Sequence, residues 1–303
     1  MVIKLPEPYA DRLQHKEPLA RYTAARLGGT SDFLYIAKES TEELATVLMA
    51  AWEQDIPVRI LGGGANVLIS DKGVRGLVVI NDVSQVTFGD WHEGRNVSAS
   101  GGLGLTVLAR KCQSRGLSGL EWAASVPGTV GGAVVNNAGA HGSDIRSNLC
   151  EAVVLEAEHG IHIMPLDELT YGYRTSALKA RFDKRFVVLL AQFALLPDDP
   201  QAILERVEHN VAYRKQTQPP GASLGSIFKN PIGDYAGRLI EAAELKGYSI
   251  GGAQVSPIHG NFLINTGGAT ATDYYALIRY VQEKVHKHSH TELELEVELI
   301  GEW

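Results

Sequence analysis

The sequence predicts an α+β fold organised in two domains. Helix and strand patterns follow one another in mixed order, which argues against the regular βαβ array of a doubly wound sheet. The chain has 303 residues, 45% of them hydrophobic, and at about 150 residues per domain this length suggests two. A break at 197–200 combines two prolines with two aspartates. Glycine is unusually frequent, with 32 glycines among 303 residues against a usual share of ~7%. The glycines fall in clusters, which predicts loops where main chain contacts a ligand.

The first part of the chain contains two clear helix patterns among short strands. Residues 40–54 predict a capped amphipathic helix, because Thr41 precedes two glutamates and apolar residues then recur at intervals of three or four. Residues 106–115 have the same spacing and end at Gly116, a residue typical of helix C-caps. Short β-branched or alternating runs predict strands at 57–61, 67–69, 76–80, 97–100, 152–156, 162–165 and 185–193.

After the break the pattern is mainly helical. Residues 293–299 are different, because they alternate strictly between apolar residues and glutamate. This alternation predicts a half-buried strand with its carboxylates on one face. The remaining patterns predict amphipathic helices at 201–215, 235–245 and 272–286, a turn at 218–223, and short strands around Val255 and at 262–264.

Charge and composition exclude several classes of function. With 28 basic and 35 acidic side chains the net charge is −7, which argues against a nucleic-acid groove or a polybasic membrane anchor. The longest strongly apolar run, 186–196, is too short to cross a bilayer, and the N-terminus lacks the apolar stretch of a secretory signal. We therefore expect a cytoplasmic protein, monomeric or weakly oligomeric, that acts on small molecules. Cys112 and Cys150 lie in apolar surroundings and are assigned no chemistry.

Two glycine-rich stretches carry the strongest indication of function. Residues 59–68 (RILGGGANVL) lead from a strand into three glycines, whose amides can form a nest for phosphate oxygens. This run is neither a P-loop nor a Rossmann fingerprint. Residues 125–140 (SVPGTVGGAVVNNAGA) combine proline, glycines and small residues, so a flat ring or a pyrophosphate can lie against main chain. Either run alone could be a tight turn, but the two together predict an extended dinucleotide.

These stretches also carry a resemblance to a known family. LGGGANVLISDKGVRGLVV and GLEWAASVPGTVGGAVVNNAGAHGSDI, followed by YGYRTSALK, LGSIFKNP, AGRLIEAAELKGYSIGGAQVSPIHGNFLIN and LELEVELIGEW, resemble the UDP-N-acetylenolpyruvoylglucosamine reductases in content and order. These are flavoproteins of the vanillyl-alcohol-oxidase type. The likeness extends from about residue 20 to the C-terminus, so it concerns nearly the whole chain.

The resemblance implies a domain organisation and a reaction. It implies an FAD-binding domain at 1–204 with subdomains of about 1–85 and 86–204, a smaller α/β substrate-binding domain at 205–288, and a terminal strand at 289–303. It further implies non-covalent FAD, NADPH as co-substrate, and reduction of UDP-N-acetylglucosamine enolpyruvate to UDP-N-acetylmuramate in peptidoglycan precursor synthesis. The positions that match the family's FAD contacts are Leu61, Gly62, Gly63, Gly64, Ala65, Asn66, Val67, Leu68, Ser125, Pro127, Gly128, Thr129, Gly131, Gly132, Ala133, Asn137, Ala138 and Gly139.

The catalytic positions that the resemblance implies are Arg174, Ser226 and Glu296. The planar cation of Arg174 suits a carboxylate or an enolate oxygen, although a structural pairing with a surface acid would also explain it. Ser226 follows a glycine without a surrounding nucleophile elbow, so we expect it to donate a proton to a carbanion rather than to act as a nucleophile. Alternation alone would make Glu296 a solvated side chain, and only the resemblance gives it a catalytic role.

The UDP diphosphate requires cations or hydrogen-bond donors. We expect Arg214, Lys229 and Asn230 to supply them, with Tyr173 and Gln254 as further candidates. The sequence between the catalytic arginine and serine leaves no room for the extra tyrosine-bearing loop of type I members, so the chain resembles type II.

Three other interpretations bear on function. The chain could be another FAD-linked oxidase of the same fold class, which reduces oxygen, or a nucleotide-sugar-binding protein that performs no redox step. His286, His288 and His290 alternate near the end of a predicted helix. Neither a zincin motif nor a carboxylate at ligand spacing accompanies them, so we predict no metal site there.

Overall fold

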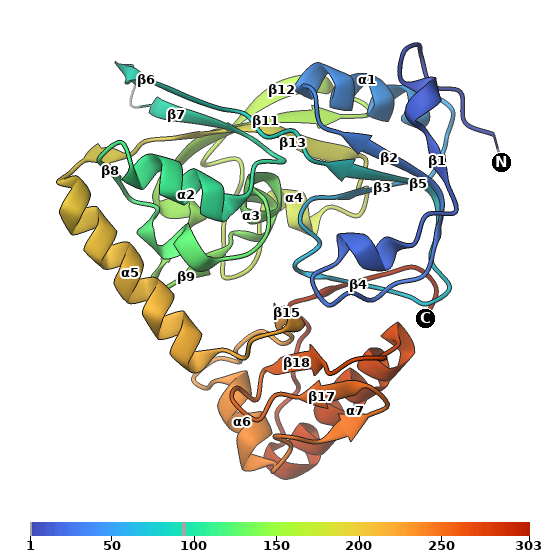
Figure 1. Cartoon of the computed structure of the whole chain (residues 1–303), viewed down its shortest axis with the longest axis vertical. Coiled ribbons are helices and arrows are strands. Elements are labelled where there is room, and N and C mark those ends of the chain that lie inside the picture. The colour runs from blue at the N-terminus through green and yellow to red at the C-terminus, as the bar shows by residue number, and fades with distance from the viewer. Residues whose placement is uncertain (1, 93–94) are drawn as a thin grey trace. The chain divides into compact units, whose positions relative to one another are not determined.

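The computed structural model describes residues 2–92 and 95–303 and divides the chain into two compact units (Figure 1). Unit 1 consists of Met1–Gln14, Phe33–Gly63 and Gly76–Tyr213, and unit 2 of His15–Asp32, Gly64–Arg75 and Arg214–Trp303. Unit 2 thus includes two segments from the first third of the chain, and also the terminal segment 289–303. The predicted domain boundaries at 204 and 288 left these two early segments in the first domain.

Unit 1 is built around two sheets. The first has the strand order β1-β2-β5-β3, with β1 (Gln14–His15), β2 (Ser31–Ala37), β5 (Val74–Asn81) and β3 (Val58–Leu61). The second has the order β12-β11-β13-β7-β6 and is antiparallel throughout, with β12 (Gly160–Pro165), β11 (Leu149–Glu156), β13 (Phe186–Phe193), β7 (Arg95–Ser100) and β6 (Val86–His92). Short strand pairs join β8 (Leu117–Ser118) to β14 (Leu196–Pro197) and β9 (Gly139–Ala140) to β10 (Ser143–Asp144).

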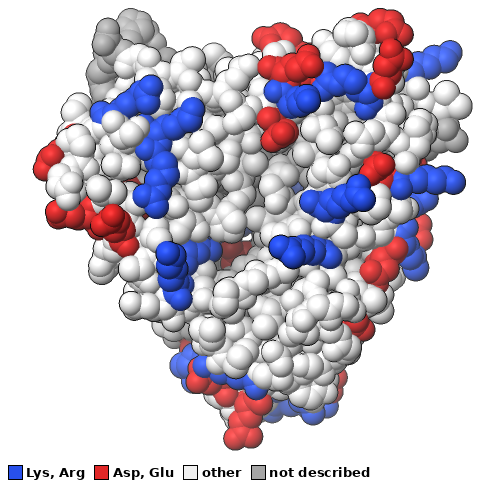
Figure 2. All heavy atoms as spheres, in the orientation of Figure 1, with Lys and Arg blue, Asp and Glu red and all other residues white. Residues whose placement is uncertain are grey.

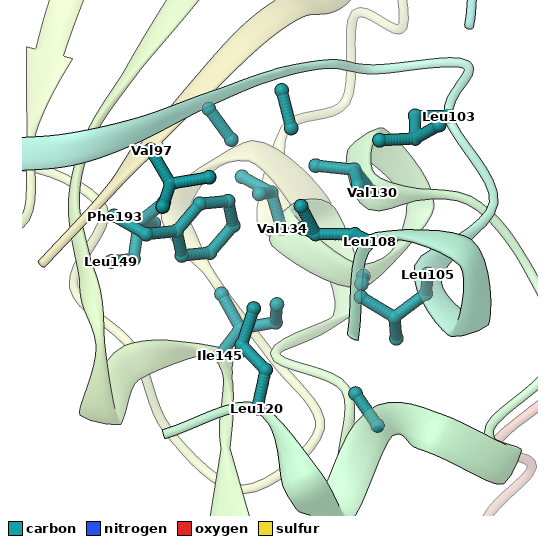
Figure 3. Packing of buried hydrophobic residues seen from close by; sticks show 14 of the residues in the cluster. Val97, Leu103, Leu105, Leu108, Leu120, Val130, Val134, Ile145, Leu149 and Phe193 are labelled. Carbon is teal, nitrogen blue, oxygen red and sulfur yellow. The ribbon is translucent and has the colours of Figure 1, made fainter. Parts of the chain in front are cut away.

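Helices cover these sheets through apolar faces. Helix α1 (Thr41–Trp52) begins at Ser40, whose hydroxyl accepts from the amide of Glu43, and its buried face packs in one core with residues of β2 and β5. Helices α2 (Leu105–Gln113) and α3 (Val130–Asn136) share a second core with β7, β11 and β13. In Figure 3, Val130 and Val134 of α3 and Leu108 of α2 point into this core. Unit 1 also contains α4 (Ala177–Ala180) and most of α5 (Pro200–Thr217).

Unit 2 contains a four-stranded sheet and a separate strand pair. The sheet order is β15-β18-β17-β16, formed by β15 (Ala222–Ser226), β18 (Phe262–Asn265), β17 (Ala253–Val255) and β16 (Ser249–Ile250), together with helices α6 (Ala236–Ala242) and α7 (Ala271–Ser289). The separate pair joins β4 (Val67–Ile69) to β19 (Glu298–Ile300) in parallel. This pairing, and the packing of Leu68 into the core of unit 2, explain why 64–75 belongs with the C-terminal residues.

The α+β class and the predicted helices are confirmed, and so are the strands predicted before residue 290. Several features differ from expectation, among them strand β6, which was not predicted. The stretch 125–140 contains helix α3 rather than an open loop. The regular strand expected at 293–299 is reduced to β19, because the preceding residues form only an isolated bridge at Leu295. Strand β2 was not predicted, because it is buried on both faces and so lacks an alternating pattern.

Candidate active site

The two glycine-rich stretches meet within unit 1. A Cβ built on Gly62 would lie 2.2 Å from Oγ1 of Thr129, so a side chain at this position would require Thr129 to move. A Cβ on Gly63 would lie 3.1 Å from the Cα of Gly128, which has a φ of +109°. Main chain of the first stretch therefore contacts the second directly. The sequence predicted that both stretches serve one ligand, and the structure brings them together.

The second stretch is a tight turn that leads into α3. The amides of Val130 and Gly131 donate to the carbonyls of Leu103 and Gly101, at 2.9 and 2.8 Å. A Cβ on Gly131 would lie 3.0 Å from the Gly101 oxygen, so this glycine permits close packing of two main-chain segments. A contact between Gly131 and a cofactor stays a prediction.

The hydroxyl of Ser125 provides a test of whether a cofactor fits here. Its oxygen is buried and has no hydrogen-bond partner within the part of the chain that the structure describes. A buried hydroxyl without a partner is costly, so a ligand atom placed there would be favourable. Together with the side-chain-free contact of Gly63 with Gly128, this unsatisfied donor fits a flat, phosphate-bearing cofactor.

The other predicted cofactor residues differ in what they can present to a ligand. Leu61, Leu68 and Ala133 have exposed fractions of 4, 1 and 5%, so little of these residues is accessible to a ligand. Gly64 and Asn137 are buried. The remaining positions are partly or fully exposed, namely Ala65, Asn66, Val67, Pro127, Gly132, Ala138 and Gly139.

Arg174 lies in a tight turn of unit 1. Gly172 and Thr175 bond to each other across the turn at 3.2 and 3.3 Å, and Arg174 has a φ of +54°, which non-glycine residues rarely adopt. Its guanidinium donates to the carbonyls of Asn137 and Gly139, at 3.3 and 2.7 Å. Both acceptors belong to the predicted cofactor stretch, so that stretch orients the arginine. Strained backbone of this kind is typical of functional sites.

Asn137 and Tyr171 connect this turn to α3. Asn137 ends α3 in the left-handed conformation, and its side-chain amide donates to the carbonyl of Gly172 at 3.0 Å and to the carboxylate of Asp144 at 3.1 Å. The hydroxyl of Tyr171 donates to the carbonyl of Val134 at 2.9 Å. Burial raises the pKa of Tyr171, so its hydroxyl keeps its proton at neutral pH. The arginine turn is therefore held by polar bonds from several sides.

Ser226 ends strand β15 in unit 2. The pairing of β15 with β18 shifts register between Ser223 and Ser226, and Gly225 between them has a φ of +73°. Such irregularities bend a strand and re-aim the side chain that follows. The direction of the Ser226 hydroxyl is therefore set by the bulge and by the glycine that permits it.

Asn261 is a site residue that the sequence analysis missed. Its side chain accepts from the amide of Phe228 at 2.9 Å and donates to the Phe228 carbonyl at 2.8 Å, while its main-chain oxygen accepts from Ile227 at 3.0 Å. Asn261 is 3% exposed and fixes the two residues after Ser226. An asparagine before a strand is common in turns, so its sequence context does not distinguish it.

The terminal segment brings Glu296 to the serine segment. The amide of Glu296 donates to the carbonyl of Ile227, the residue next to Ser226, at 2.8 Å. One residue earlier, Leu295 forms an antiparallel bridge with Phe228. Ser226 and Glu296 therefore lie on paired segments of unit 2, whereas Arg174 belongs to unit 1.

Glu296 also differs in exposure from the other glutamates of this segment. Glu292, Glu294 and Glu298 are exposed, whereas Glu296 is partly buried. The expectation of four carboxylates on one solvated face is wrong for Glu296, because the segment is not a regular strand at this point. Because the regular alternation is lost here, the carboxylate of Glu296 does not share the solvated face of the other three glutamates.

Two of the three candidate diphosphate residues, Lys229 and Asn230, are held by neighbours within unit 2. The ammonium of Lys229 forms an ion pair with the carboxylate of Glu294, and the side-chain oxygen of Asn230 accepts from the amide of Ala236 at 3.1 Å, at the start of α6. Burial lowers the pKa of Arg214, whose ordinary value is high enough that it remains a cation.

The two less certain substrate candidates lie in different units. Gln254 on β17 donates to the carbonyl of Gly247 at 3.1 Å, while Tyr173 of unit 1 is 56% exposed and lies 5.6 Å from the guanidinium carbon of Arg174, measured to the ring centroid. Within residues 2–92 and 95–303, no group of three or more His, Cys, Asp or Glu could hold a metal ion. The same residues form no helix that is long and apolar enough to cross a membrane.

Comparisons with known families match the segments that carry these residues. A model of an FAD binding domain matches residues 34–159. A model of the UDP-N-acetylenolpyruvoylglucosamine reductase C-terminal domain matches residues 216–300. The first range contains both glycine-rich stretches, and the second contains Ser226 and Glu296.

Relatives and a solved structure extend the likeness over the whole chain. A UDP-N-acetylenolpyruvoylglucosamine reductase of Bacillus pumilus is 39% identical over 302 residues, covering 99% of this chain and 97% of the relative. That of Bacillus subtilis is 38% identical over 305 residues, covering 99 and 98%. The crystal structure of a UDP-N-acetylenolpyruvylglucosamine reductase from Thermus caldophilus has a TM-score of 0.78 at 32% identity, covering 95% of this chain and 98% of that one.

Proposed function

The chain belongs to the UDP-N-acetylenolpyruvoylglucosamine reductase family, and from that premise we propose how its residues divide the work. It is an FAD-containing oxidoreductase with the fold of vanillyl-alcohol-oxidase-type flavoproteins. With NADPH as co-substrate it reduces UDP-N-acetylglucosamine enolpyruvate to UDP-N-acetylmuramate in peptidoglycan synthesis. The reaction therefore contributes to cell wall biogenesis, and through it to cell shape and division.

Cofactor binding is assigned to the two glycine-rich stretches. Gly62, Gly63 and Gly128 present main chain without side chains, and Ser125 offers an unsatisfied hydroxyl. FAD bound there would supply the hydride chemistry that links NADPH to the C3 carbon of the enolpyruvyl group. The protein residues then have to manage charge and protons on the substrate.

Stabilisation of the charge that develops on the substrate is assigned to Arg174 and Glu296. Hydride addition at C3 leaves negative charge on C2 and on the attached carboxylate, so a planar cation with a fixed direction stabilises it. The two carbonyls that hold Arg174 support this role. An ionised Glu296 would repel the substrate carboxylate, so Glu296 is protonated in the complex or neutralised by the arginine.

Ser226 completes the reaction by donating a proton to C2. The observation that carries this assignment is the pairing of the two segments, in which the amide of Glu296 bonds to the residue next to Ser226. A serine hydroxyl is a weak acid and requires a strongly basic acceptor, which the carbanion at C2 provides. One hydride at C3 and one proton at C2 balance the reduction.

The substrate diphosphate is assigned to Arg214, Lys229 and Asn230, with Gln254 and Tyr173 as further contacts. Buried and partly buried cations suit phosphate oxygens because the charge interaction is screened less than at an exposed surface. We propose a monomer or weak oligomer. Both co-substrates are charged phosphate esters, and we assign the reaction to the cytoplasm.

The test is an anaerobic titration of the purified protein. NADPH should bleach the flavin absorbance, and the enolpyruvyl nucleotide sugar should restore it. Restoration by oxygen alone, at a rate comparable with turnover, would favour an oxidase of the same fold class. A protein that is colourless and does not take up FAD would favour a nucleotide-sugar-binding protein without a redox step.

A further prediction concerns the ion pair of Lys229 with Glu294. If Lys229 binds the diphosphate, Glu294 competes for its ammonium, so Glu294→Gln should lower the KM for the nucleotide sugar about two- to fivefold with kcat unchanged. This size is typical of an exposed ion pair. Steady-state kinetics at low and high salt measure it, and salt should reduce the difference. Glu292→Gln is the control, because it removes an exposed carboxylate of the same segment without touching this pair. An unchanged KM in Glu294→Gln would argue against Lys229 as a diphosphate ligand.

A further inference from the structure

Asn66 connects the first glycine-rich stretch to Glu296. Its side-chain Nδ2 donates to the main-chain carbonyl of Glu296 at 3.1 Å, and its own carbonyl accepts from the amide of Glu298 at 2.9 Å. A main-chain carbonyl can only accept, so the NH₂ end of the Asn66 amide must face Glu296. All three residues belong to unit 2.

Glu296 lies where the terminal chain changes its hydrogen-bonding partner. Before it, Leu295 bridges Phe228 in antiparallel sense. After it, Glu298 pairs with Val67 in the parallel pair β19–β4. Between these two pairings the carbonyl of Glu296 lies outside a regular ladder, and main-chain carbonyls in partly buried positions need a donor. Here the donor is the side chain of Asn66 rather than another strand.

We propose that Asn66 is a positioning residue for Glu296 in the reductase reaction. The inference rests on the proposed catalytic role of Glu296. The amide of Glu296 is fixed by Ile227 and its carbonyl by Asn66, so both peptide groups that flank its Cα are held. Only the second bond is made by a side chain, and it alone can be removed by substitution. Displacement of a reacting group by about 1 Å can cost roughly 10²-fold in rate.

Asn66→Asp is the test variant, because it keeps the size of the side chain and places an acceptor against the Glu296 carbonyl. We expect recovery of the flavin absorbance by the enolpyruvyl substrate to be about 10- to 100-fold slower. Because Asn66 is also among the candidate FAD contacts, the Kd for FAD is measured as well and both half-reactions are followed at saturating FAD. Under these conditions recovery by the substrate should be slowed at least about tenfold more than bleaching by NADPH. Stopped-flow absorbance and fluorescence titration with FAD measure the three quantities.

Hydrogen exchange of the holoenzyme supplies a readout that does not depend on turnover. In the wild type, the amides of the terminal segment 295–300 should be protected, since they take part in the pairings described. In Asn66→Asp the same segment should exchange at least about tenfold faster. Asn66→Ala, which removes the donor without adding an acceptor, should show the same direction of change and serves if the aspartate variant does not fold.

Asn265→Asp is the matched control. Asn265 makes the same kind of bond within unit 2, from its Nδ2 to the carbonyl of Ala25 at 3.0 Å, but it holds a different segment. It should leave exchange at 295–300 and both half-reactions within about threefold of the wild type.

Distinct outcomes overturn the inference and the proposed function. Unchanged exchange at 295–300 together with an unchanged second half-reaction in Asn66→Asp overturns the inference. So does equal slowing of both half-reactions, or a Kd for FAD raised enough to explain the loss, because Asn66 would then act on the cofactor alone. Glu296→Gln tests the premise separately, since a normal second half-reaction in that variant would refute the role of Glu296 itself.

Discussion

Ser226→Ala should slow the recovery of flavin absorbance by the enolpyruvyl substrate by about 10²–10⁴-fold, the usual contribution of a positioned proton donor. Bleaching by NADPH should be nearly unchanged, because no proton from Ser226 is needed for that step. The substitution removes one oxygen at the end of β15, and the bulge at Gly225 remains. Anaerobic stopped-flow measurement of the two half-reactions separates these effects.

Ser223→Ala is the control for this experiment. Ser223 lies on the same strand and pairs with Ile264 in the regular part of the ladder, so its loss should change neither half-reaction by more than about twofold. If Ser226→Ala slowed both half-reactions equally, its role as proton donor would be refuted and a general effect on the flavin environment would replace it.

Gly64→Ala should cause the second large effect, on stability and on FAD content together. Gly64 has a φ of +59°, and a Cβ built on it would lie 1.9 Å from the carbonyl oxygen of Tyr22. The left-handed conformation alone costs a non-glycine residue about 1–3 kcal/mol, and the clash adds to it. The carbonyl of Gly64 also accepts from the amide of Ala24 at 3.0 Å, a bond that the shifted chain would lose. Denaturant unfolding and the ratio of flavin to protein absorbance measure both effects.

Gly233→Ala separates strain from clash. Gly233 has a φ of +79°, but nothing lies within 4 Å of a Cβ built on it, so alanine there should cost only the conformational strain, about 1–2 kcal/mol. FAD content should be normal. Equal losses in the two variants would mean that the contact with Tyr22 contributes nothing.

Periodic patterns in the sequence predicted most of the fold, because the spacing of apolar residues in amphipathic helices and half-buried strands shows which residues are buried. The prediction failed where burial has no period, as in β2, whose residues are buried on both faces. It also failed for helix α3, where glycines that usually indicate a loop permit close packing against Gly101. The exchange of 64–75 into unit 2 depends on a pairing with the C-terminus that no local pattern contains.

The candidate site could be predicted by residue type and motif, but not the contacts that hold it. Glu296 is the clearest case, because alternation placed it with exposed neighbours whereas the structure partly buries it. The bonds made by Asn66 and Asn261 join residues 230 and 33 positions apart, and a sequence pattern reports only near neighbours. The roles of Arg174, Ser226 and Glu296 are proposed because whole segments resemble the family.

The parallel pairing of β4 with β19 affects how the chain can fold during synthesis. Residues 67–69 leave the ribosome early, but their partner strand lies at 298–300, and Leu68 packs in a core that includes Val297. Chains generally fold from the N-terminus as domains emerge. Unit 2 can complete its core only after residues 297–300 have emerged from the ribosome, so its early apolar segments stay exposed to chaperones and to other nascent chains until then.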